Sequence, residues 1–205
     1  MRHTPPKETL SPFSRTFSRT FSLAFFFSAA LMGCQNKSTP KPASAVSAPA
    51  STQDAPSLSK LSKEQTKRLS TTLKAYEALR SALAQDKLSD VSDLAAQLER
   101  SLKEASEGAT QNMSAQLSVM REAALKLKDK ALSSKSDEQR RLFGEVSKGV
   151  VTLLSTHKSL AQGLHVFSCP MAQGYKKWVQ PNSKLENPYM GGRMLRCGGR
   201  SDLSP

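Results

Sequence analysis

A long stretch without proline, from Leu58 to Gln162, limits what this chain can fold into. It contains only three glycines, and its apolar residues recur at intervals of three or four. That spacing lines apolar side chains along one face of an α-helix, whereas a β-strand would need alternation by two. The pattern predicts four helices, over residues 62–85, 89–107, 110–133 and 137–162.

Each predicted helix carries one apolar stripe that it cannot bury alone. Met113 and Met120 lie on the stripe of the third helix and His157 on that of the fourth, so we expect all three to be core residues. Short polar connections, such as residues 133–136, favour antiparallel neighbours. We therefore expect a mainly α fold, built on an antiparallel four-helix bundle over residues 58–162.

The composition changes at residue 163, and residues 163–205 hold six of the ten glycines, both C-terminal cysteines and three methionines. Residues 164–168 and 175–180 read as two strands of a short β-hairpin, with a turn at residues 172–174. Asn187 suits a helix N-cap, Pro188 suits the first helical position, and Gly198 suits the end. We expect a small Cys/Met-rich unit, with this hairpin and a short helix, packed on the bundle.

Sulfur side chains recur in this unit at spacings that predict a metal site. An extended strand would project His165, Cys169 and Met171 to one face. A helix would stack Met190, Met194 and Cys197 along one stripe. Thiolate and thioether donors select Cu(I), and by the same softness Ag(I). The predicted ligands are Cys169, Met171, Met194 and Cys197, with Met190 and His165 as additions, and Trp178 is placed to cap the site.

The N-terminus has the pattern of an export signal. Four basic residues precede an apolar run from Phe21 to Gly33 that is shorter than the roughly 20 residues of a membrane-spanning helix. The run ends in Leu31-Met32-Gly33-Cys34, which resembles the lipobox of bacterial lipoproteins. Residues 1–33 are therefore predicted to be a cleaved lipoprotein signal peptide, with a lipid on Cys34. The alternative is an ordinary signal peptide followed by an incidental cysteine.

The segment after the predicted lipid, residues 34–57, is rich in Ser, Thr, Ala, Pro and Lys and is predicted to be a disordered tether. The formal net charge is +13, and removing the leader leaves +10. In the bacterial cell envelope such a protein meets anionic lipid and polysaccharide, so nucleic acid is not an expected partner. By the sorting rule of enterobacterial lipoproteins, Gln35 after the lipid-bearing cysteine implies the outer membrane, facing the periplasm.

A disulfide between Cys169 and Cys197 is the alternative to a metal site. If lipidation takes up Cys34, these two cysteines remain as an even pair in an oxidising compartment. The chain would then be a non-catalytic structural or interaction lipoprotein. Catalysis is not expected, because only His157 and His165 remain after the leader and no phosphate-binding loop or nucleophile–base pair is evident.

The spaced motif of the C-terminal unit resembles a domain family. Its residues here are Cys169-Pro170-Met171-Ala172, Trp178, Asn187-Pro188-Tyr189-Met190-Gly191, Met194 and Cys197-Gly198. The family comprises uncharacterised periplasmic and lipoprotein domains, some appended to membrane-fusion subunits of heavy-metal efflux systems. The resemblance is strongest from about Leu142 to Gly198. It implies copper handling, with heavy-metal efflux components as partners.

Overall fold

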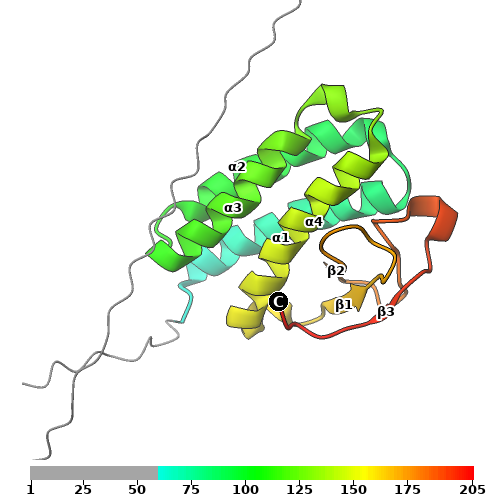
Figure 1. The fold of residues 1–205 in the computed structure, drawn as a ribbon. Helices are drawn as coiled ribbons and strands as arrows, with labels where there is room; N and C mark the ends of the chain where they lie inside the picture. Colours follow the sequence, from blue (N-terminus) through cyan, green and yellow to red (C-terminus); the bar gives the residue numbers. More distant parts are fainter. Residues whose placement is uncertain (1–59) are drawn as a thin grey trace, which may run out of the picture. The chain divides into compact units, whose positions relative to one another are not determined.

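The computed structural model describes residues 60–205, and they form four helices followed by a small sheet (Figure 1). The helices are α1 (Lys63–Ala84), α2 (Val91–Ser106), α3 (Gln111–Leu127) and α4 (Ser136–Thr156). They pack antiparallel in chain order, which confirms the predicted mainly α class. The predicted signal peptide over residues 1–33, the lipid on Cys34 and the tether over residues 34–57 lie outside the described residues.

The helix boundaries follow local capping. Ser62 accepts a hydrogen bond from the backbone N–H of Gln65 at 3.0 Å, and Thr110 accepts one from Met113 at 3.4 Å. These side chains satisfy donors that the first turn of a helix leaves unpaired. None of the helices within residues 60–205 is both long and apolar enough to cross a membrane.

Two helices end earlier than their apolar pattern predicts. The third ends at Leu127 and is followed by a short 3₁₀ helix, Lys130–Leu132. The fourth ends at Thr156, because His157 has φ −116° and ψ 69°, outside the helical region, before a 3₁₀ helix at Lys158–Ala161. His157 is half-exposed at this break, so the expectation that it is a core residue is wrong. Met113 and Met120 are buried as expected.

The bundle is open on one side, where the C-terminal unit packs. α1 and α4 touch at only a few points, and the second strand of the sheet contacts both (Figure 1). Tyr76 of α1 stacks on Phe143 of α4 with ring centroids 5.4 Å apart, and Tyr189 lies 5.7 Å from Phe143. Trp178 meets Tyr189 edge-on at 5.8 Å and is fully buried. This aromatic cluster joins the two parts into one core.

The sheet is antiparallel, in the order β2-β1-β3. Its strands are β1 (His165–Ser168), β2 (Lys177–Gln180) and β3 (Gly199–Arg200), and the predicted hairpin is β1–β2. The short helix is a 3₁₀ helix of four residues, η4 (Gly191–Met194). The expectation that it runs from Asn187 to Cys197 is wrong. Gly191 has φ +61°, a left-handed conformation that interrupts a right-handed helix.

A chain of hydroxyl groups joins the sheet to the bundle. The N–H of Val179 donates to the Tyr76 hydroxyl at 3.2 Å, which lies 2.8 Å from Ser147 Oγ. Ser147 donates to the carbonyl of Lys177 at 2.9 Å, so the hydroxyl of Tyr76 must donate to Ser147. Burial raises the pKa of Tyr76, which stays a neutral donor. These hydrogen bonds fix the position of the sheet relative to α1 and α4.

Candidate functional site

The two C-terminal cysteines meet at the end of β1. Cys169 follows the strand, and its backbone N–H donates to the carbonyl of Lys176 at 3.0 Å. Its Sγ lies 3.8 Å from Sγ of Cys197, and no disulfide joins the two in this structure. Cys169 is fully buried whereas Cys197 is half-exposed. A ligand would therefore reach this thiol pair from the side of Cys197.

The position of Cys197 depends on Asn187, whose side chain is fully buried. Its amide nitrogen donates to the carbonyl of Cys197 at 2.7 Å, and its backbone N–H donates to that of Leu195 at 2.9 Å. Its Oδ1 accepts from the N–H of Tyr189 at 2.8 Å, which is the contact expected of an N-cap. One side chain thus begins the turn and also closes the loop that returns Cys197 to β1.

Gly198 allows the close approach of the two cysteines. Its φ is +124°, and a Cβ at this position would lie 2.4 Å from the carbonyl oxygen of Ser168. It would also lie 3.3 Å from the ring of Trp178. Only glycine fits there, because another residue would push Cys197 away from the end of β1. Trp178 therefore packs against Gly198, the residue after Cys197, and its role as a cap of a metal site stays a prediction.

The thiol pair has the spacing of two ligands to one ion. Two metal–sulfur bonds of about 2.3 Å, the length in zinc–thiolate sites, would span about 3.8 Å at a tetrahedral angle, which equals the observed separation. The hydrogen bond with Cys169, together with burial, raises the pKa of the Cys197 thiol. A metal ion would therefore have to displace protons from this pair.

The three methionines of the predicted site gather at a different place from the thiols. Met171, Met190 and Met194 line one pocket of about 270 Å³. Neither cysteine lines it. The two places are distinct because β1 ends at Ser168 and residues 187–198 do not form the helix whose stripe would align Met190, Met194 and Cys197. The structure thus divides the predicted ligands into a thiol pair and a methionine pocket.

His165 belongs to neither group. It begins β1, and its Nδ1 lies 3.2 Å from Nη1 of Arg200. Four residues of extended chain separate it from Cys169, which corresponds to roughly 13 Å. Among residues 60–205, no group of three or more His, Cys, Asp or Glu side chains could hold a metal ion. The thiol pair therefore has no third ligand from these four residue types within the described part of the chain.

Comparison of the chain with protein-family models, with curated proteins and with solved structures found no match in any of the three. The fold and the site define the protein only as a small helical domain whose C-terminal sheet carries paired thiols beside a methionine pocket.

Two residues that the sequence did not single out hold the methionine-bearing loop. Arg140 donates to the carbonyls of Leu83 and Pro188 and to Oδ1 of Asp86. Asp86 Oδ2 accepts from the N–H of Gly192 at 2.7 Å. We call this set, Asp86 with Arg140, the loop anchor. Burial lowers the pKa of Arg140, and the nearby Asp86 carboxylate acts against that shift. The loop anchor connects Asp86 to Arg140, which is 54 positions further along the chain, and to Gly192, which is 106 positions further. No local sequence pattern indicates contacts over such separations.

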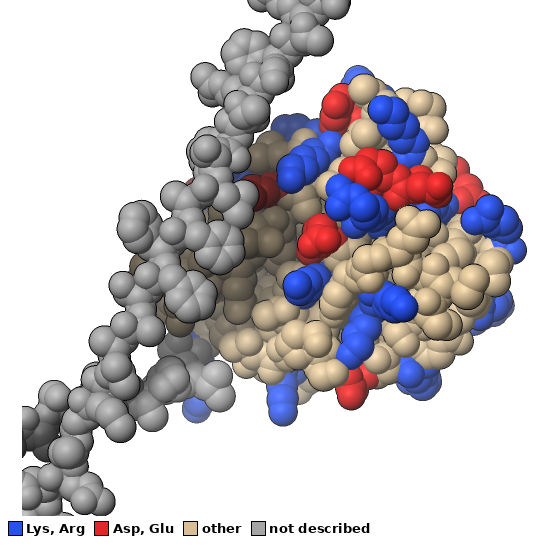
Figure 2. Space-filling model, viewed as in Figure 1, with Lys and Arg blue, Asp and Glu red and all other residues tan. Residues whose placement is uncertain are grey.

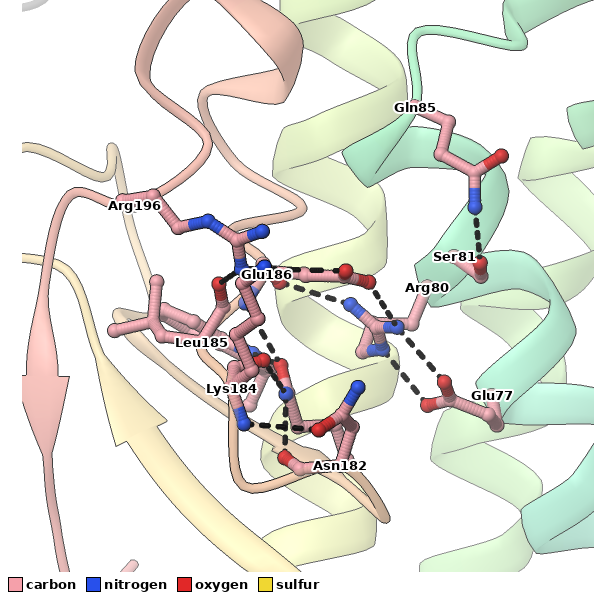
Figure 3. A network of polar contacts seen from close by, with 11 residues as sticks. Glu77, Arg80, Ser81, Gln85, Asn182, Lys184, Leu185, Glu186 and Arg196 are labelled. Carbon is pink, nitrogen blue, oxygen red and sulfur yellow. Dashed lines mark hydrogen bonds and ion pairs between the residues drawn. The ribbon is translucent and has the colours of Figure 1, made fainter.

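A second buried arginine binds the same segment to α1 (Figure 3). Arg80 is 2% exposed and makes two hydrogen bonds to the Glu77 carboxylate, both at 2.7 Å. It also donates to the carbonyl of Glu186 at 2.8 Å. Burial acts to lower the pKa of Arg80, but the hydrogen bond and charge of Glu77 outweigh it and the pKa is raised. The guanidinium thus stays charged inside the fold.

Proposed function

We propose that this protein is a bacterial envelope lipoprotein that binds a soft monovalent metal ion, Cu(I) or Ag(I), for buffering or for delivery to efflux. The observation that carries the proposal is the 3.8 Å contact between the sulfurs of Cys169 and Cys197. Two thiolates at this separation can share one ion without movement of the backbone. Soft sulfur ligands favour Cu(I) and Ag(I) over Mg²⁺ or Ca²⁺.

The surroundings of the thiol pair support this assignment. Cys169 is enclosed by the fold, which limits its access to oxidants, while Cys197 is reachable from solvent. Asn187 and Gly198 restrain the approach of the two sulfurs from the backbone side. A binding site of this kind is held ready before the ion arrives, so less conformational entropy is lost on binding.

The cellular setting is part of the proposal. The N-terminal pattern that ends at Cys34 supports a lipid anchor, and Gln35 supports the outer membrane facing the periplasm. The resemblance of the Cys169 to Gly198 motif to domains of heavy-metal efflux systems supports delivery to such components. Basic side chains are spread over the visible face of the molecule, with acidic ones mainly in its upper part (Figure 2), which supports contact with the anionic lipid of an envelope membrane.

Competition titration with Cu(I) tests the metal assignment. Residues 35–205, reduced and without lipid, would be titrated against a Cu(I) chelator. We expect Cys169→Ser combined with Cys197→Ser to weaken binding at least a hundredfold, which is about 2.7 kcal/mol. His165→Gln is the matched control and should leave the affinity unchanged, because His165 lies at the far end of β1. Unchanged affinity in the double serine variant would contradict the proposal.

The second candidate is a structural disulfide, and the same sulfur contact favours it. Bond formation requires the two sulfurs to close from 3.8 Å to about 2.05 Å, a small movement. Such a bond would stabilise the fold by about 3 kcal/mol and would remove both thiols as metal ligands. Intact mass of natively purified protein, with and without reductant, separates the candidates. Two free thiols per chain would argue against the disulfide.

A further inference from the structure

The methionines of the described residues fall into two environments. Met113 and Met120 are 5% and 0% exposed in the helical core. Met171 and Met194 are 61% and 41% exposed, and with Met190 they line the single pocket described above. A core filler is enclosed on all sides, so packing alone does not explain the exposure of Met171 and Met194, whereas Met190 is partly buried against the core.

Two elements bring these three side chains together. Met171 lies in the turn that follows β1, while Met190 directly precedes η4 and Met194 is its last residue. The loop anchor holds the second element, because Asp86 accepts from the N–H of Gly192 and Arg140 donates to the carbonyl of Pro188. Asp86 itself has φ +57°, in the left-handed region that favours glycine. Its carboxylate therefore has a positional role that glycine could not supply.

Charges near the pocket largely balance. Arg140, Arg141 and Arg193 line it together with Asp137. Arg140 is paired with Asp86 at 2.5 Å, and Arg141 is paired with Glu138 at 2.7 Å. The lining itself therefore carries three guanidinium groups and one carboxylate, and the pairing of Arg140 with Asp86 and of Arg141 with Glu138 offsets two of the three positive charges. Arginine stays protonated and cannot ligate a metal, which leaves the thioethers as the soft donors of the pocket.

We propose that Met171, Met190 and Met194 form a thioether site for Ag(I) or Cu(I) that is separate from the thiol pair. The proposal shares with the proposed function only the choice of ion. Thioethers carry no proton that must be displaced, and they do not form disulfides. The methionine site therefore binds metal whether Cys169 and Cys197 are reduced or oxidised.

Silver titration followed by NMR tests the methionine site. The sample would be residues 35–205, which keep every described residue, with Cys169→Ser and Cys197→Ser and with ¹³C in the methionine methyl groups. In chloride-free buffer, Ag(I) should shift the methyl signals of Met171, Met190 and Met194 and saturate at one equivalent. The signals of Met113 and Met120 serve as internal controls and should not move.

Leucine substitutions test the ligands one by one. Met171→Leu, Met190→Leu and Met194→Leu should each weaken Ag(I) binding about tenfold or more, and the triple variant should abolish it. Met113→Leu is the matched control and should bind as the parent does. Circular dichroism checks that each variant is folded, and the exposure of Met171 and Met194 makes their replacement structurally mild.

The outcomes separate the two sites. A cysteine-free protein that binds no silver overturns the methionine site but leaves the thiol proposal standing. Equal shifts at Met113 and Met120 also overturn it, because they indicate non-specific binding. Silver binding that is identical with and without the cysteines supports the methionine site and contradicts the thiol pair.

Discussion

Removing Glu77, the partner of the buried Arg80, should destabilise the fold far more than removing one partner of a matched pair on the surface. Glu77 and Arg80 are three residues apart on α1, with both contacts at 2.7 Å and Arg80 2% exposed. Glu138 and Arg141 have the same order and spacing on α4, with contacts of 2.8 and 2.7 Å. Their side chains are 40% and 46% exposed. Burial is therefore the main difference between the pairs.

Replacing Glu77 with glutamine should lower the free energy of unfolding by about 2 kcal/mol. Removing one partner of a fully buried ion pair costs roughly 3–5 kcal/mol. The value is smaller here because Glu77 is 28% exposed and the Glu186 carboxylate stays 3.6 Å from Arg80. Glu138→Gln, the control, should leave the free energy of unfolding nearly unchanged, because solvent screens an exposed pair.

Urea unfolding of the two variants measures this difference. For a slope of about 2 kcal/mol per molar urea, Glu77→Gln should lower the midpoint by about 1 M, and Glu138→Gln should leave it nearly unchanged. The slope itself should not change. Equal losses in both variants would refute the argument that burial of the Arg80 guanidinium raises the cost of losing its partner.

Three further predictions concern other parts of the chain. Gly149→Ala should destabilise the protein by about 1–3 kcal/mol on thermal unfolding, because the new Cβ would lie 2.2 Å from a buried methionine carbon, whereas Gly144→Ala has room and should stabilise it by up to about 1 kcal/mol. The pKa of Asp202 is lowered to about 2 by hydrogen bonds from the Ser204 hydroxyl and from Lys177, so this contact stabilises the fold above the ordinary Asp pKa of about 3.9 and is lost as the pH falls toward 2. An NMR carboxyl titration should show Lys177→Gln raising that pKa, and an unchanged value would contradict the assignment. Cys34→Ala should move the protein from the membrane to the soluble fraction of cells, and continued membrane association would argue against lipidation there.

The helices could be predicted from the sequence because their signals are local. Apolar spacing located all four, and the side chains of Ser62 and Thr110 mark two of their starts. The break at His157 could not be predicted, because the apolar pattern continues through it to Leu160 while the backbone leaves the helical region. Strand β3 has only Gly199 and Arg200, and its pairing with β1 is the sole reason that it is a strand.

The division of the sulfur residues could not be predicted for a different reason. The spacing of Met190, Met194 and Cys197 fits a helical stripe, and Asn187 does act as a cap. The left-handed conformation of Gly191 depends on a tertiary neighbour, since a Cβ there would lie 2.0 Å from the Asp86 carboxylate. The contact between Cys169 and Cys197, in contrast, joins two residues that the sequence alone pairs, either as ligands of one metal site or as a disulfide.

The open side of the bundle also shapes how the protein folds. α1 and α4 meet mainly through Tyr76 and Phe143, and the wall between them is completed by Trp178 and Tyr189 from the end of the chain. The hydrogen bond from Arg80 to the carbonyl of Glu186 joins residues that are 106 positions apart and so closes a long loop of the chain. Closing a loop of that length is entropically costly before its contacts can compensate, so folding should be slower than for a bundle of local contacts. The first helix gains its last contacts only after the C-terminal segment has been made, so a chain still being synthesised lacks the residues that complete its core.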